Sequence, residues 1–153
     1  MVQGTYATSY RYQTYEFTRT SDRGRCFFYG GLAGDSAMSQ SIDLNSYLSV
    51  INSGNVSFNL SAWLGGYSSQ NDCAQVSVCF LNQFYQPIGN QTVIGPVLAA
   101  DRTGTTSLLP RQAGGPVPIG SRYVTIIVTM VRFNPTDNDG AADNLVLALN
   151  NAL

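Results

Sequence analysis

The 153-residue sequence has no histidine and no lysine, and Glu16 is its only glutamate. Without histidine, the chain lacks the side chain that ordinarily titrates near neutral pH and the imidazole that commonly binds metals. Without lysine, it has no side-chain amine that forms a Schiff base with a carbonyl substrate. Catalysis would have to depend on carboxylates, so we predict that the protein is not an enzyme.

The sequence also lacks a basic cluster and a long apolar run. All eight positive charges are arginines, and the net charge is −1. A surface without clustered positive charge is a poor match for nucleic acid or anionic lipid. A helix that spans a membrane needs about 18 or more consecutive apolar residues, which this sequence does not contain. We therefore expect no nucleic-acid partner and no membrane insertion.

The three cysteines are Cys26, Cys73 and Cys79. If residues 74–81 form a strand, Cys73 and Cys79 lie about 20 Å apart, at ~3.3 Å per residue. A disulfide requires Cα atoms within about 7 Å, so these two residues cannot pair with each other. At most Cys26 pairs with one of them, and the alternative is three free thiols.

Apolar and polar residues alternate along much of the chain, which is typical of β-strands with one buried face. The clearest strands are expected at 55–64, 74–81, 122–133 and 144–149, and weaker ones at 10–19, 25–29, 38–44, 91–98 and 105–110. Short helical structure is expected only within 43–54, where a Ser/Asn cap precedes an apolar stripe that ends at Gly54. Turn residues separate the strands at short intervals. We predict a single domain over 1–153, an antiparallel β-sandwich of about eight or nine strands, with 1–20 as an edge strand or arm.

Several short motifs resemble the galactose-binding-domain-like jelly rolls. The motifs are "CFFYGG" (26–31), "SQSIDL" (39–44), "AWLGGYSSQND" (62–72) and "ADNLVL" (142–147), and the similarity extends over roughly residues 25 to 150. This superfamily includes many carbohydrate-binding modules and the sugar-recognising F-box-associated domains. The resemblance implies a jelly-roll sandwich that binds a glycan.

The same resemblance implies a calcium ion, which is usually structural in this superfamily. Asp143 matches the aspartate that helps to bind this ion in several members. The Asn-Gly-x-Glu pattern that usually opens the first strand is absent ahead of "CFFYGG". Glu16, in "YEFTRT", is the candidate replacement for the missing acidic ligand.

The polar stretch "DNDGAADNL" (137–145) has three open interpretations. As a calcium site, Asp137, Asp139 and Asp143 would supply carboxylate oxygens, although an EF-hand is excluded because its twelfth position is Ala148. As a sugar-binding loop, Asn138 and its neighbours would contact hydroxyl groups. As a simple hairpin connection, Asn138 and Asp139 would adopt the left-handed backbone conformation that turns require.

The stretch "WLGGYSSQND" (63–72) is the main candidate ligand site. Trp63 falls on the polar face of its strand, where its ring can stack on the apolar face of a sugar. The residues that follow supply hydroxyl, amide and carboxylate groups, which can form hydrogen bonds with sugar hydroxyls. These residues are Tyr67, Gln70, Asn71 and Asp72. In the alternative interpretation, Trp63 closes one end of the sandwich.

The arginines of the C-terminal half are candidates for ion pairs. Arg102 or Arg132 would pair with Asp137 or Asp139, because the planar guanidinium binds a carboxylate through two hydrogen bonds. In the alternative, Arg132 would contact an acidic glycan.

We therefore predict a non-catalytic, lectin-like glycan-binding module, with calcium as a candidate structural ion. The alternative is a structural or adhesive β-sandwich module that mediates protein assembly without a sugar site, as a homo-oligomer joined through the tyrosine-rich start of the chain. Three Asn-x-Ser/Thr acceptor patterns, at Asn55, Asn59 and Asn90, favour an extracellular or cell-surface location.

Overall fold

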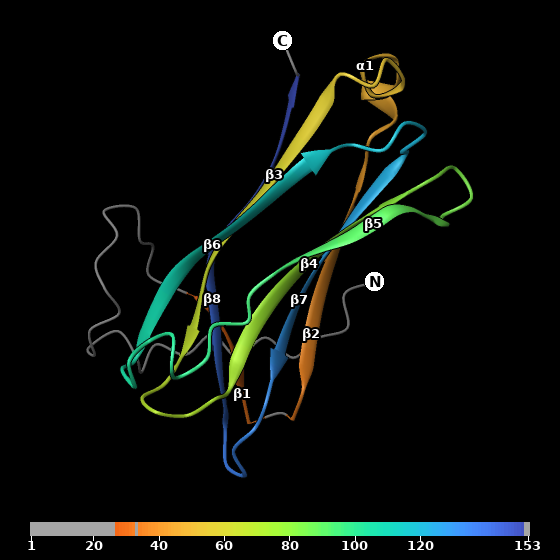
Figure 1. Cartoon of the computed structure of the whole chain (residues 1–153). Coiled ribbons are helices and arrows are strands. Elements are labelled where there is room, and N and C mark those ends of the chain that lie inside the picture. The colour runs from red at the N-terminus through yellow and green to blue at the C-terminus, as the bar shows by residue number, and fades with distance from the viewer. Residues whose placement is uncertain (1–26, 33, 152–153) are drawn as a thin grey trace.

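The computed structural model describes residues 27–32 and 34–151, which form two antiparallel four-stranded sheets that face each other (Figure 1). In the first sheet the strand order is β1-β8-β3-β6, and in the second it is β2-β7-β4-β5. The predicted β-sandwich jelly roll is confirmed. The strands are β1 (Phe28–Gly31), β2 (Ser36–Asp43), β3 (Val56–Gly66), β4 (Cys73–Leu81), β5 (Pro87–Ile94), β6 (Ser107–Pro116), β7 (Tyr123–Val131) and β8 (Asn138–Asn151).

The predicted alternation builds the core between the two sheets. In β3, Phe58, Leu60 and Leu64 are buried, and in β4 the same holds for Val76 and Phe80. The rings of Phe58 and Phe80 join the sheets, with their centroids 5.2 Å apart and their planes at 56°. An aromatic pair of this kind adds about 0.5–1.5 kcal/mol to the free energy gained by burial.

Among residues 27–32 and 34–151, helical structure is limited to the predicted segment 43–54. A 3-10 turn, η2 (Asn45–Tyr47), leads into the short helix α1 (Leu48–Asn52), which closes one end of the sandwich (Figure 1). Gly54 follows with a positive φ of 77°, as expected for a residue that ends a helix. Within the described residues, no helix has both the length and the apolar character needed to cross a bilayer.

Two strand boundaries differ from the prediction for physical reasons. The strand expected at 91–98 is β5, and it ends at Ile94 because Pro96 has no N–H to donate to a neighbouring strand. The strand expected at 105–110 is β6, which continues to Pro116 because β3 pairs with it along its whole length.

The prediction that 137–145 forms a loop is wrong, because β8 already begins at Asn138. The Asn138 amide donates to the Gly34 carbonyl (2.8 Å) and accepts from the Gly140 N–H (3.1 Å), so its polar groups are paired inside the fold. A Cβ at Gly140 would lie 2.3 Å from the Cys73 carbonyl oxygen, so the close approach of β8 to β4 requires glycine. The turn that precedes β8 is confined to 134–137.

Within the described part of the chain, the first sheet is shorter on its β1 side. β1 has 4 residues and pairs with the start of β8, which has 14. Beside β1, a groove of about 800 Å³ opens between the two sheets. Its lining is mainly apolar and includes Phe28, Met38 and Leu147. The predicted strand 10–19, the candidate arm 1–20 and Glu16 lie outside the described residues.

Cys73 and Cys79 are both free thiols and stand near opposite ends of β4, as expected from their spacing. Cys26 lies outside the described residues. Burial raises the pKa of the Cys73 thiol, and the charge of Asp72 adds to the effect.

Candidate functional site

A second apolar cluster lies on the outer face of the first sheet, away from the main core. Neighbouring residues show the division, because Leu64 and Ala142 belong to the core whereas Trp63 and Ala141 belong to the outer cluster. The outer cluster is completed by Leu108 and by two aromatic residues from the start of the described chain, Phe27 and Tyr29. The predicted placement of Trp63 on the outer face of β3 is therefore found, and other aromatic side chains accompany it there.

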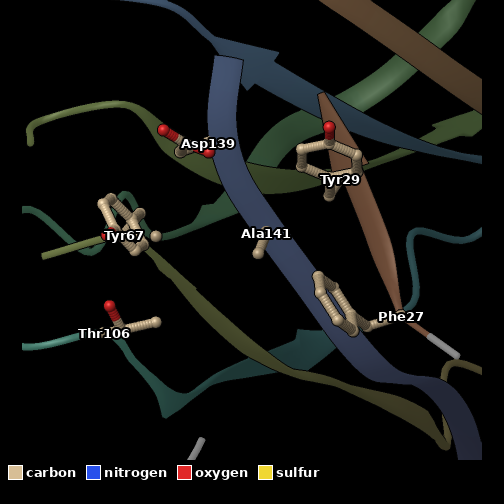
Figure 2. A pocket seen from close by; sticks show the side chains of 7 residues that line it. Phe27, Tyr29, Tyr67, Thr106, Asp139 and Ala141 are labelled. Carbon is tan, nitrogen blue, oxygen red and sulfur yellow. The ribbon is translucent and has the colours of Figure 1, made fainter. Parts of the chain in front are cut away.

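A shallow hollow indents this face beside β8 (Figure 2). Tyr29 and Phe27 stand on one side of β8, Tyr67 and Thr106 stand on the other, and Asp139 projects from β8 between them. Tyr67 is 40% exposed. The enclosed volume is about 10 Å³, which is room for about one water molecule. A sugar ring cannot enter this hollow but can lie across the rings that form its rim. We call Phe27, Tyr29, Trp63 and Tyr67 the aromatic surface.

The Asp139 carboxyl is the most strongly perturbed acidic group of this face. Its residue is only 8% exposed. Burial raises its pKa to about 6, and the negative charges of Asp72 and Asp137 add to the rise. Burial also raises the pKa of the Tyr29 phenol, with further contributions from Asp137 and Asp139. The hollow therefore combines aromatic rings with negative charge.

Arg102 organises the two loops that flank the hollow. Its guanidinium is 2% exposed and donates to the carbonyls of Gly66 (2.9 Å), Ser68 (2.9 Å), Gln70 (2.7 Å) and Thr105. These bonds hold the β3–β4 loop against the loop that leads into β6. Its burial lowers the pKa of Arg102 from its usual value. Hydrogen bonds from a charged donor are about twice as strong as neutral ones, so the Arg102 bonds hold the two loops beside the hollow firmly in place.

The predicted pairing of Arg102 with Asp137 or Asp139 is wrong, because its guanidinium donates to backbone carbonyls. The loop carbonyls accept from both Nη atoms of this buried side chain, while its Nε makes no hydrogen bond with the described residues. Among the described residues, the ion pair found is that of Arg111 with Asp101, at 3.9 Å on the surface. Arg132 is exposed and donates to the Thr136 carbonyl at 3.4 Å.

Asp72 is fully buried and serves as an acceptor for backbone groups. Its carboxylate accepts the N–H groups of Phe133 (2.5 Å), Asn134 (2.9 Å) and Asp139 (3.3 Å). It therefore fixes the turn before β8, and its position is below the surface on which a ligand would lie.

The other predicted ligand residues are spread around the same end of the sandwich. The Asn71 side chain accepts the Ala99 N–H (3.2 Å), while Gln70 contributes its backbone carbonyl to Arg102. Asn138 is fully buried and faces inward from β8. Of the seven predicted ligand residues, Trp63 and Tyr67 lie on the aromatic surface.

The three predicted calcium ligands are not gathered into one site. Asp139 and Asp143 lie on the outer face of β8, four positions apart, and Asp143 pairs with Trp63 in register. Within the described residues, no group of three or more acidic, histidine or cysteine side chains has the arrangement of a metal site. Calcium binding stays a prediction.

Sequence reasoning missed Phe27 and Tyr29 as members of the site. The signal that could have found them is the parity of "CFFYGG", since Phe27 and Tyr29 point opposite to Phe28 on a strand. Phe28 lines the groove between the sheets, whereas its two neighbours join the outer cluster.

No protein-family model matches the sequence, and no curated protein matches it. The structure is similar to the enzymatically active domain of tailspike protein 4 from bacteriophage CBA120, with 12% identity and a TM-score of 0.60. That match covers 97% of this chain and 18% of the tailspike chain. A second match, to a Clostridium thermocellum xylanase 10B, covers 21% of the xylanase chain. The chain therefore spans about a fifth of the length of these two proteins.

Weaker similarities lead to separate small modules. One is the CBM22-1 xylan-binding domain of Paenibacillus barcinonensis Xyn10C, with 11% identity, a TM-score of 0.48 and coverage of 100% of this chain and 86% of the other. Another is the CBM35 module of Cellvibrio japonicus Abf62, with 12% identity, a TM-score of 0.46 and coverage of 100% and 90%. Together with the two-sheet topology, the tailspike match shows a likeness of fold.

Proposed function

We propose that the protein is a non-catalytic, lectin-like module that binds a glycan on the outer face of its first sheet. The observation that carries the proposal is the aromatic surface, in which Phe27, Tyr29 and Tyr67 line the hollow and Trp63 belongs to the outer apolar cluster beside it. Flat aromatic rings bind the apolar faces of sugars, and the shallow hollow favours stacking over enclosure. The similarity to modules named for carbohydrate binding agrees with this assignment.

Polar groups at the rim would fix the orientation of the sugar. Asp139 and Thr106 line the hollow, and Asp143 lies beside Trp63. Carboxylates and hydroxyls accept the hydrogen bonds that sugar hydroxyls donate. Stacking provides most of the contact area, and these few polar groups provide selectivity.

The proposed location is extracellular or at the cell surface. The three acceptor asparagines, Asn55, Asn59 and Asn90, are all exposed in the fold. Glycosylation at these positions requires solvent access, so the structure is compatible with modification at each of them.

A glycan array followed by calorimetry tests the proposal. Trp63→Ala and Tyr67→Ala should each weaken binding at least about tenfold, since stacking and its buried area contribute more than about 1.4 kcal/mol. Phe84→Ala is the matched control, because Phe84 is 70% exposed in the turn at the far end of β4. Equal loss in all three variants, or no bound glycan on the array, would contradict the proposal.

The groove between the sheets favours the second candidate, a structural or adhesive module that forms homo-oligomers. Its volume and mainly apolar lining suit a segment of another polypeptide chain. Sedimentation over a range of concentrations tests this function. If the groove joins two copies of the chain, Leu147→Arg in its lining should convert the protein to a monomer without changing glycan binding.

A further inference from the structure

The Asp139 carboxylate lines the aromatic hollow, and no described residue supplies a counter-charge to it. Its backbone N–H donates to Asp72, but its side chain makes no hydrogen bond or ion pair with any described residue. The residue is more than nine-tenths buried and projects into the hollow (Figure 2). Buried carboxylates are normally paired, because removing the charge from water is costly. An unpaired one in a surface hollow therefore points to a ligand.

The neighbouring charges increase the need for a cation. Asp72 and Asp137 both act to raise the pKa of Asp139, so the local potential is negative. Arg102 lies close by, because its Nη2 atom and the Asp139 carbonyl oxygen would both contact a Cβ placed at Gly66. Its Nη1 and Nη2 atoms donate to loop carbonyls, and none of the described hydrogen bonds joins it to the Asp139 carboxylate. A neutralising charge would act to lower the pKa of that carboxyl, whereas burial, Asp72 and Asp137 all act to raise it.

The aromatic rings around Asp139 also favour positive charge. Tyr29, Phe27 and Tyr67 surround the hollow, and the face of an aromatic ring attracts cations through its quadrupole. Rings combined with a carboxylate suit an ammonium group, because the carboxylate pairs with its charge and the rings pack against its carbon neighbours. A neutral hydroxyl would satisfy only the hydrogen bond.

We propose that the aromatic surface recognises glycans that contain an amino sugar with a free amine, whose ammonium group pairs with Asp139. This inference rests on the proposed function and specifies the class of glycan. The sugar ring stacks on the aromatic surface, and the ammonium descends into the hollow where about one water molecule fits. Acetylation of the amine removes the charge and adds bulk, so the acetylated sugar is excluded.

Calorimetry with three oligosaccharides of equal length and β-1,4 linkage tests the inference. One is built from glucosamine, one from N-acetylglucosamine and one from glucose, and the titrations are made slightly above pH 6. The free-amine oligosaccharide should bind about 10- to 100-fold more tightly than the others, as expected for a charged hydrogen bond in a partly buried site. Equal affinity for all three would overturn the inference but support the proposed function. No binding of any of them, together with an empty glycan array, would count against the proposed function itself.

Two variants distinguish a specific ion pair between Asp139 and the ammonium group from attraction by the net charge of the protein. Asp139→Asn keeps the size and the backbone hydrogen bond, and should remove the preference for the amine. Asp43→Asn changes the net charge equally on an exposed residue at the opposite end of the fold, and should leave the preference intact. A preference that survives in Asp139→Asn would overturn the inference, as would its loss in Asp43→Asn. If Asp139→Asn does not fold, the comparison of the three oligosaccharides with the wild-type protein still decides the question.

Discussion

Asp139→Asn should make the protein more stable at neutral pH, although it removes a charged side chain from β8. The folded state raises the pKa of this carboxyl from 3.8 to about 6, chiefly because the group is buried. At about 1.4 kcal/mol per pKa unit, this rise corresponds to a penalty of about 3 kcal/mol for the ionised form. Asparagine has nearly the same shape and carries no charge, so the variant avoids the penalty.

The sign of the pH dependence follows from proton binding. Between about pH 4 and pH 6 the folded protein holds the proton of Asp139 more tightly than the unfolded chain does. The free energy of unfolding of the wild-type protein therefore falls as the pH rises through this window, and the full penalty is present above about pH 6. Below about pH 4 the group is protonated in both states and the penalty disappears.

Urea unfolding of both proteins at about pH 3 and about pH 7.5 measures the effect. The variant should exceed the wild type by about 3 kcal/mol at the higher pH and match it at the lower one, which serves as the internal control. A variant that is less stable at pH 7.5, or a difference that is the same at both pH values, would refute the reasoning. Either result would mean that Asp139 has a partner that compensates its charge.

Three further measurements test other parts of the structure. Arg102→Ala should lower the free energy of unfolding by at least about 3 kcal/mol, because four buried or partly buried hydrogen bonds to loop carbonyls are lost. Arg111→Ala, which breaks a surface ion pair, should cost less than about 1 kcal/mol. Gly140→Ala should lower the melting temperature, because its Cβ would overlap the Cys73 carbonyl oxygen; an unchanged melting temperature would show that β8 can move away from β4. Bound calcium should raise the melting temperature above its value in chelator and Asp143→Asn should remove that rise, whereas equal values in calcium and chelator would contradict the calcium prediction.

The fold could be predicted from the sequence because its signals are local. The alternation in "NVSFNLSAWL" places Phe58, Leu60 and Leu64 in the core and Trp63 on the outer face, as the structure has them. The period of two is a property of each strand alone. It therefore needs no knowledge of which strands become neighbours.

The candidate site was only partly predictable, because its decisive contacts are between distant parts of the chain. Asp72 binds the backbone of residues 61 to 67 positions away, and Asn138 binds Gly34, 104 positions away. These partners turn apparent loop residues into a strand and apparent ligands into structural acceptors. Local composition, which suggested a turn, carries no information about such partners.

The role of Arg102 has a thermodynamic consequence for ligand capture. Because its bonds lock the two loops beside the hollow before any ligand arrives, little conformational freedom remains to be lost on association. Complex formation should then occur without backbone rearrangement, and weakening this lock should increase the entropic cost of binding more than it changes the contacts themselves.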